Sequence, residues 1–144
     1  MPPDTLLDFS CLDNQGAIDF FFERTQGLHD SCITGFSVCN PMYVNTSGSM
    51  VFPTEGFPGS TSLSIFFQSQ FLSGATIELK LAAVEHLRFQ GIGKGNDGIV
   101  LDAKLTLEEK NGVLLVCNPD VVDFLEVKAK SAFWRLRNDI TCES

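Results

Sequence analysis

Apolar and polar residues alternate along most of the chain after residue 60, and this alternation predicts β-strands. In the stretch 76–81, Ile77, Leu79 and Leu81 face one way, whereas Glu78 and Lys80 face the other. That pattern is typical of a half-buried antiparallel strand. Further strands are predicted at residues 62–67, 84–89, 99–107, 113–116 and 124–136. A bulge at Ala82-Ala83 would join 76–81 and 84–89 into one bent strand.

Turn-forming residues between these strands predict hairpins. Residues 91–98 are rich in Gly and Asn, which tolerate the positive φ of tight turns, so we expect the flanking strands to pair. Asn111-Gly112 is a type I′ turn signal and predicts a second hairpin. The run 113–116 that follows is continuously apolar, as expected of a central strand covered on both faces.

The first third of the chain has a less regular pattern. Asp13 or Asn14 could cap a short helix that Gly27 would end, but the three successive Phe residues 20–22 also fit a buried strand. Residues 33–38 predict the first strand, closed by Asn40-Pro41. Residues 45–59 predict a long surface loop, with room for a short strand at 50–52.

These elements predict one mainly β domain over residues 1–144, with a lead-in at 1–30 and helix confined to that lead-in. The expected architecture is an antiparallel sheet curled or folded into a sandwich. A chain of 144 residues suits one compact domain. The core is expected to contain the residues in one phase of the alternation: Ile77, Leu79, Leu81, Ile99, Leu101, Leu105, Leu115, Leu125 and Val127.

Charge and hydropathy narrow the possible partners and location. Eighteen acidic against ten basic residues give a formal charge of −8, which disfavours binding to nucleic-acid phosphates. No apolar run approaches the roughly 20 residues that span a bilayer, and the start Met-Pro-Pro-Asp is acidic where a secretory signal would be basic. We therefore expect a cytoplasmic protein without membrane or nucleic-acid partners.

The five cysteines, at positions 11, 32, 39, 117 and 142, show no metal-site pattern. Their number is odd and no pair has the C-x-x-C spacing, so neither a zinc site nor a disulfide framework is predicted. Reduced thiols that behave as small hydrophobic side chains fit better. A local bridge between Cys32 and Cys39 stays open as an alternative.

Candidate catalytic residues are few, because His29 and His86 are the two histidines of the chain. The pair His29-Asp30 suggests a metal-dependent phosphohydrolase or, with Ser31, a catalytic triad. A phosphohydrolase needs further metal ligands on a helical scaffold. A triad of His29, Asp30 and Ser31 is disfavoured because side chains of adjacent residues do not generally converge on one point. The Gly-rich stretch around Lys94 lacks the residue order G-x-x-x-x-G-K-[ST] of a phosphate-binding loop. We therefore predict no enzyme, no cofactor and no metal.

A structural role for His29-Asp30 is the simpler hypothesis. An Asp carboxylate at a turn accepts backbone N–H bonds, and a His ring packs and donates to a carbonyl group. The alternative is direct contact with a partner. Among the late basic residues, Lys128 and Lys130 share one strand face by period two and are expected to face solvent.

Three segments resemble a family of small bacterial β-rich proteins that includes immunity-type proteins of polymorphic-toxin systems. They are Leu28-His29-Asp30-Ser31-Cys32-Ile33, residues 77–87 and residues 125–135. The shared features are a His-Asp-small step leading into the first strand, a strand before a Gly-rich turn, and a late charged strand with a Trp. The match covers residues 28–137, and the segment 45–59 departs from it. The resemblance implies a cytosolic binding protein without a catalytic site, in its narrower form an inhibitor of a co-encoded toxin.

The leading hypothesis is therefore a non-enzymatic protein-binding protein with an acidic surface suited to a basic toxin. We expect His29, Asp30, Trp134 and Arg135 to contact the partner. The alternatives are a small-ligand or carbohydrate-binding β domain, which the scarcity of Trp and Tyr disfavours, and a structural or assembly subunit of a phage or secretion device.

Overall fold

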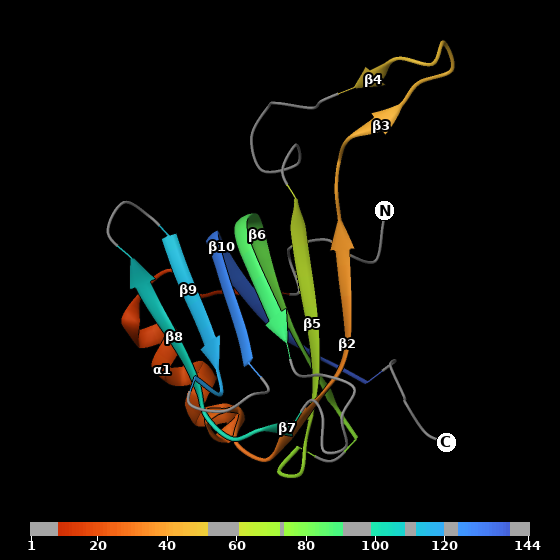
Figure 1. The fold of residues 1–144 in the computed structure, drawn as a ribbon. Helices are drawn as coiled ribbons and strands as arrows, with labels where there is room; N and C mark the ends of the chain where they lie inside the picture. Colours follow the sequence, from red (N-terminus) through yellow and green to blue (C-terminus); the bar gives the residue numbers. More distant parts are fainter. Residues whose placement is uncertain are drawn as a thin grey trace.

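Ten strands, one α-helix and one 3₁₀ helix form the described part of the computed structural model, which comprises residues 9–51, 61–72, 74–90, 99–108, 112–119 and 124–138 (Figure 1). The helices are α1 (Gln15–Arg24) and η2 (Gln26–Leu28). The strands are β1 (Ser10–Cys11), β2 (Ser31–Cys39), β3 (Tyr43–Val44), β4 (Met50–Val51), β5 (Ser62–Ser69), β6 (Thr76–Gln90), β7 (Ile99–Val100), β8 (Ala103–Glu108), β9 (Gly112–Cys117) and β10 (Phe124–Arg137).

The main sheet has the strand order β7-β2-β5-β6-β10-β9-β8, and β1 pairs with the C-terminal half of β10. Every neighbouring pair among these described strands is antiparallel. A second, two-stranded sheet of β3 and β4 projects from the end of β2 (Figure 1). The predicted fold class, a mainly β protein with an antiparallel sheet, is confirmed.

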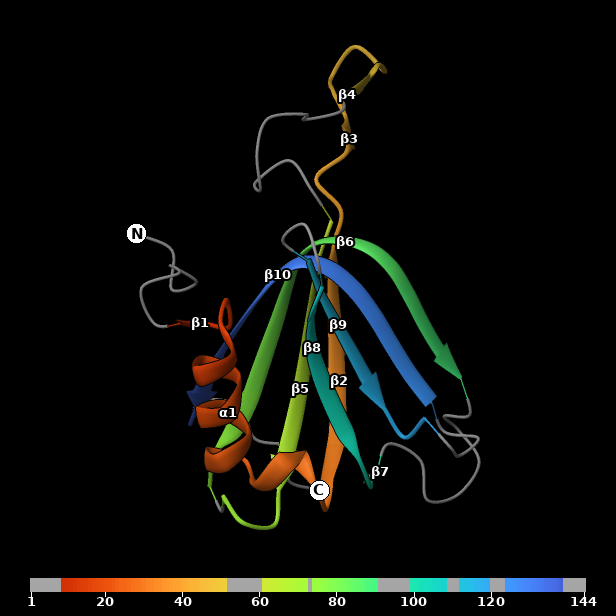
Figure 2. The same ribbon diagram turned by 90° about the vertical axis from the view of Figure 1, so that its left-hand side faces the viewer.

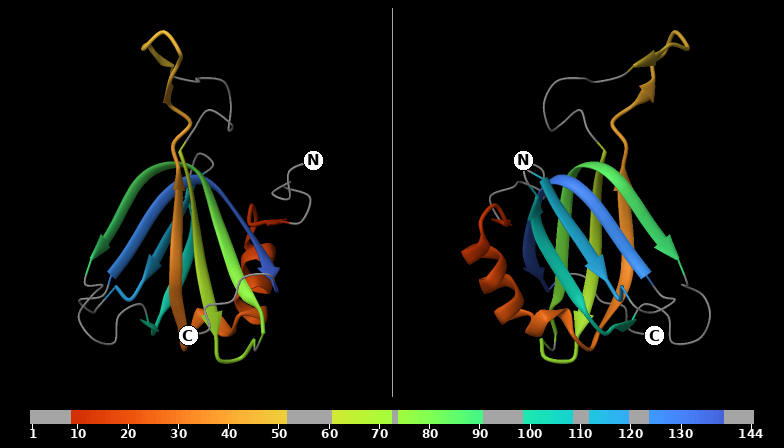
Figure 3. Two further views of the ribbon diagram at one scale, coloured as in Figure 1. Left: turned by 90° about the vertical axis from the view of Figure 1, so that its right-hand side faces the viewer. Right: turned by 60° about the vertical axis from the view of Figure 1, so that its left-hand side comes forward.

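The sheet folds over itself because β6 and β10 are both long and bent. Ala83 has a φ of 54°, and the register between β6 and β10 shifts between Lys128 and Ala129. Both strands arch over the top of the molecule in Figures 2 and 3, so that their two halves belong to opposing parts of the sheet. The ring centroids of Phe36 on β2 and Phe89 near the end of β6 thereby come within 4.4 Å. The predicted bulge and the single bent strand are confirmed.

The core lies on the inner side of this folded sheet. Alternate residues of β5, β6, β9 and β10 point inward. Ile65 and Leu79, which are opposite each other on β5 and β6, are both fully buried. The fully or almost fully buried side chains of these strands are Leu63, Ile65, Phe67, Ile77, Leu79, Leu81, Val113, Leu115, Leu125 and Val127. Burying such side chains stabilises the fold by roughly 1.5–3 kcal/mol each relative to exposure.

Helix α1 adds a further apolar layer to this core. The Asn14 side chain accepts a 2.9 Å hydrogen bond from the Ala17 N–H, which caps the helix as predicted. Ile18 and Phe21 are buried, and the Phe21 ring lies 5.0 Å from the ring of Trp134 on β10. The three Phe residues thus belong to a helix, because a helical period turns Phe21 inward while Phe20 stays 55% exposed.

The single strand predicted at residues 99–107 is wrong. It is two strands at opposite edges of the sheet, since β7 pairs with β2 and β8 pairs with β9. The crossing at Leu101-Asp102 resets the alternation, so Val100 is fully buried whereas Leu101 is 53% exposed. Leu101 is therefore not a core residue, and Ile99 is only partly buried.

The pairing predicted for the strands that flank residues 91–98 is also wrong. Strand β6 pairs with β5 along its first half and with β10 along its whole length, while β7 pairs with β2. Strand β7, which follows residues 91–98 in the sequence, thus lies beside β2 and not beside β6. Residues 91–98 themselves lie outside the described residues, as do the predicted frayed end at 140–144 and residues 52–60 of the predicted loop.

The second predicted hairpin is confirmed, with Glu108 opposite Gly112 in the pairing of β8 and β9. Strand β9 is less covered than expected, since Leu114 and Val116 are only half-buried on the outer face. Within the predicted long loop, β4 confirms a short strand at residues 50–51, and it pairs with β3.

Leu79 and Leu101 were both predicted as core residues, but the structure gives opposite expectations for them. Leu79→Ala removes a fully buried side chain and should lower the free energy of unfolding by about 2–5 kcal/mol. Leu101→Ala, at an exposed position, should change it by less than about 0.5 kcal/mol. Urea unfolding of both variants measures this difference, and equal losses would contradict the crossing at Leu101-Asp102.

Candidate functional site

The chain turns from α1 into β2 through a corner with an unusual backbone. Gln26, Gly27, Leu28 and Asp30 have φ values of 54°, 67°, 59° and 58°. The left-handed region costs a residue other than glycine roughly 1–2 kcal/mol. Three such residues within five positions persist only where the surrounding structure holds them, and backbone strain of this kind clusters at functional sites.

Contacts within the corner hold this conformation on the side of α1. The Thr25 hydroxyl donates a 2.8 Å hydrogen bond to the Phe21 carbonyl, and the Ser31 hydroxyl donates to the Leu28 carbonyl. Thr25, Leu28 and Ser31 are completely buried. The corner is therefore fixed by hydrogen bonds and by an apolar side chain that reaches the core.

Asn118 fixes the segment that packs against the corner. Its side-chain oxygen accepts hydrogen bonds from the N–H groups of Leu101 (2.7 Å) and Asp102 (3.2 Å), and its amide nitrogen donates to the Ile99 carbonyl (2.8 Å). The crossing from β7 to β8 is thus tied to the end of β9. Because Asn118 is buried, these bonds also satisfy polar groups that would be costly to leave unpaired.

Two hydrogen bonds join the corner to this segment. The Asp30 N–H donates to the Val100 carbonyl at 3.0 Å, and His29 Nδ1 lies 2.8 Å from the Leu101 carbonyl oxygen. Since a carbonyl oxygen only accepts, Nδ1 is the donor of this bond. The expectation that the His29 ring donates to a carbonyl is confirmed.

The corner presents exposed side chains around this rigid backbone. Phe71 and Leu101 are each 53% exposed, and the side chains of His29 and Asp30 are 56% and 42% exposed. The Gln70 N–H approaches the Asp30 carbonyl at 3.5 Å, which brings the turn between β5 and β6 to the corner. The start of β2, strand β7 and this turn lie at the same end of the sheet in Figure 1. We call His29, Asp30, Phe71 and Leu101 the corner patch.

The Asp30 side chain does not play the part predicted for it. In the described residues, no backbone N–H donates to its carboxylate, which lies 3.6 Å from His29 Nε2. Asp30 contributes through its backbone instead, because its N–H, its carbonyl and its left-handed φ shape the corner. Asp and Asn enter this region more readily than most residues.

Trp134 and Arg135 lie away from the corner patch and are buried. Trp134 is 6% exposed and packs against Phe21 on the inner face of the sheet. Arg135 is 9% exposed and lies on the outer face, opposite Glu78 in the strand register. The structure therefore brings His29 and Asp30 together at the surface and assigns packing and ion-pair contacts to the other two residues.

The buried partner of Arg135 is Glu78, which the strand alternation placed on a solvent face. Glu78 Oε1 lies 2.8 Å from Arg135 Nε and 3.1 Å from an Arg137 guanidinium nitrogen, and the Ser64 hydroxyl donates to Oε2 at 3.1 Å. The Phe9 ring lies over the cluster, with its centroid 4.2 Å from the Arg135 guanidinium carbon. Burial of such a carboxylate requires these partners. This cluster is a structural feature of the outer face.

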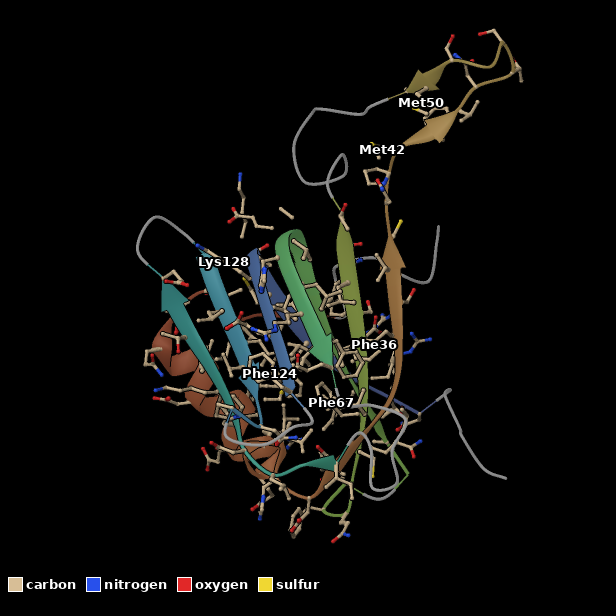
Figure 4. The ribbon with its side chains drawn as sticks, viewed as in Figure 1. Phe36, Met42, Met50, Phe67, Phe124 and Lys128 are labelled. Carbon is tan, nitrogen blue, oxygen red and sulfur yellow. The ribbon has the colours of Figure 1, made fainter. Side chains whose placement is uncertain are left out.

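The N-terminal half of β10 carries two exposed lysines. Lys128 and Lys130 are exposed, as predicted, and Figure 4 shows Lys128 and Phe124 along this part of the strand. The neighbouring His86 Nε2 lies 2.9 Å from Glu126 Oε2, and the Arg88 guanidinium carbon lies 5.3 Å from the Phe124 ring centroid. These are pairs on a solvated strand face, worth little in stability.

The cysteines of the described residues are free thiols. Cys32 and Cys39 stand at opposite ends of β2, about 23 Å apart at the usual rise per strand residue, so the local bridge considered above is wrong. Cys11, Cys32 and Cys39 are exposed rather than packed as small hydrophobic groups, whereas Cys117 is buried. Burial and, to a lesser extent, Asp102 raise the pKa of Cys117 to about 12.

The described residues contain neither a metal-binding cluster nor a membrane-spanning helix. No three His, Cys, Asp or Glu side chains among them group together in a way that could hold a metal ion. No helix of that part of the chain is long and apolar enough to cross a membrane. Comparison with family models, with curated proteins and with solved structures finds no match for the chain.

The role of Asp30 can be tested by separating its carboxylate from its backbone. Asp30→Gly should keep the free energy of unfolding within about 0.5 kcal/mol, because relief at positive φ offsets the added freedom of the unfolded chain. Asp30→Val should lower it by about 1–2 kcal/mol. Denaturant titration compares the two, and an equally unstable Asp30→Gly would show that the carboxylate itself is needed.

The raised pKa of Cys117 predicts selective thiol chemistry. At about pH 8 a thiol with a pKa of about 12 stays protonated and unreactive, so iodoacetamide should modify Cys32 and Cys39 but not Cys117 in the folded protein. Unfolding in urea should make Cys117 reactive. Peptide mapping by mass spectrometry follows each site, and rapid alkylation of native Cys117 would contradict its burial.

Proposed function

We propose that the protein is a non-enzymatic binding protein whose partner is another protein, contacted through the corner patch. The observation that carries this proposal is the strained corner, in which Gln26, Leu28 and Asp30 are held in the left-handed region next to exposed Phe71 and Leu101. A fold needs no such strain merely to lead a helix into a strand. Strain that is maintained at the surface supports a role in recognition.

The composition of the corner patch suits protein recognition. Phe71 and Leu101 offer apolar surface that a partner would remove from water, and the exposed side chains of His29 and Asp30 offer polar groups for hydrogen bonds to it. The hydrogen bonds of Asn118 and His29 hold the backbone before a partner arrives. Such preorganisation lowers the entropy cost of association.

Toxin neutralisation is the form of binding that we favour. The resemblance to immunity-type proteins begins with Leu28-His29-Asp30-Ser31, the segment that forms the corner and the start of β2. A net charge of −8 would speed encounter with a basic toxin through long-range attraction, while the corner patch would supply the close contact.

The proposal is tested by the partner that gene neighbourhood suggests. The product of the adjacent gene is expressed with and without this protein in a growth assay, and the affinity of the two purified proteins is measured by calorimetry. The double variant Phe71→Ser, Leu101→Ser should weaken binding roughly 10- to 100-fold. Its melting temperature should change little, because both side chains are exposed.

Leu107→Ser is the matched control, since Leu107 is another exposed leucine, on β8. It should rescue growth and bind as the wild type does. Unaltered binding by the double variant would refute the corner patch as the contact site. A small molecule that, at 100 times its dissociation constant, stabilises the protein by roughly 2.7 kcal/mol would favour a ligand-binding domain instead.

A further inference from the structure

The two edges of the main sheet differ in how they meet solvent. Strand β8 forms one edge, and β7 and β2 form the other. Within the described residues, β7 pairs only with Ser31 and Cys32, so the outer edge of β2 has no strand partner from Ile33 to Cys39. From Gly35 to Cys39, β2 pairs residue for residue with β5 and is regular. A regular strand with a free edge has unpaired N–H and C=O groups that another strand can bind.

Charge distinguishes these edges further. Strand β8 carries Lys104 and Glu108, the kind of residue that natural edge strands use against unwanted pairing. Strand β2 carries none, and the sequence contains no Asp, Glu, Lys, Arg or His anywhere from residue 31 to residue 54. In a protein of net charge −8, this segment forms an uncharged region next to a free strand edge.

Apolar side chains extend this uncharged region beyond β2. The hairpin of β3 and β4 continues from the end of β2 and stands clear of the main sheet in Figures 1 to 3. Its exposed apolar residues, together with the last apolar residue of β2, are Val38, Met42, Tyr43, Val44 and Met50. We call residues 40–51, which include this hairpin, the arm, and Figure 4 shows Met42 and Met50 on it. An isolated two-stranded hairpin is at best marginally stable in water, so contact with further protein would stabilise it.

We propose that β2 pairs antiparallel with β2 of a second copy of this chain, forming a two-fold symmetric dimer with a continuous sheet. A two-fold axis between identical edge strands makes their pairing antiparallel. The partner strand comes from a second copy of the chain. Two copies of charge −8 repel each other where their carboxylates face, whereas this uncharged edge lets them meet without opposing like charges. A basic partner would gain nothing from a surface without carboxylates.

The arm contributes the apolar area that strand pairing alone lacks. A stable interface buries roughly 800 Å² on each partner, which backbone hydrogen bonds along one short strand do not supply. Each arm continues past the paired strands toward the other copy, where its exposed methionine and tyrosine side chains would be covered. The dimer does not rest on the proposed function, because it is argued from the free edge of β2 and not from the corner patch.

Sedimentation velocity over a concentration series from micromolar to near-millimolar tests the dimer. Wild-type protein should associate to a dimer, and added salt should strengthen association by screening the repulsion between acidic bodies. Ser37→Lys places a charge on the exposed side of β2 and should raise the dissociation constant at least about tenfold. Circular dichroism and melting temperature verify that the variant is folded.

Thr106→Lys is the matched control, because it adds the same charge at an exposed position of the opposite edge strand, β8. It should leave the dimer unchanged. Hydrogen exchange of the peptide covering β2 should slow as the concentration rises, in wild-type protein and not in Ser37→Lys. A wild-type protein that stays monomeric, equal weakening by both lysine variants, or unchanged exchange in β2 would overturn the proposal. Loss of toxin binding without loss of the dimer would refute only the proposed function.

Discussion

The bend in β6 and β10 is the constraint on which the rest of the structure depends. A strand of 15 residues would leave one face of a flat sheet in water. The left-handed residue Ala83 and the register shift between Val84 and His86 turn the second half of the strand back over the first. The two halves then share one core, in which Phe36 and Phe89 meet across the fold. Helix α1 adds Ile18 and Phe21 to that core and encloses Trp134.

The crossing from β7 to β8 depends on this bend, because the fold brings the two sheet edges close enough for Leu101-Asp102 to connect them. Asn118 then holds the crossing through three side-chain hydrogen bonds, and the crossing in turn holds His29 and Asp30. The exposed corner patch is thus a consequence of core topology. Its side chains come from three segments that are distant in sequence. The backbone of these segments is held in place by contacts between them and not by the local conformational propensity of each.

Polar and apolar surfaces are distributed in a way that supports two separate contacts. The cluster of Glu78, Arg135 and Arg137 pairs one acidic group with two basic groups on the outer face, while Lys104, Lys128 and Lys130 remain exposed. The edge of β2 and its arm carry no charge at all. The corner patch combines apolar side chains with His29 and Asp30 at the far end of that strand. We propose the corner patch for contact with a different protein and the edge of β2 for contact with a second copy.

The sequence by itself determined most of the strands, the bulge at Ala82-Ala83, the cap at Asn14 and the hairpin of β8 and β9, because alternation, capping and turn chemistry are local properties. It also drew attention to His29 and Asp30. Only the tertiary structure decided which strands pair, since pairing depends on which edges are already occupied. That choice exposed Leu101 and buried Val100, joined Glu78 to Arg135 beneath Phe9, and brought Phe71 to the corner. Burial depends on what lies across the sheet, and a single strand's pattern carries no information about its neighbour.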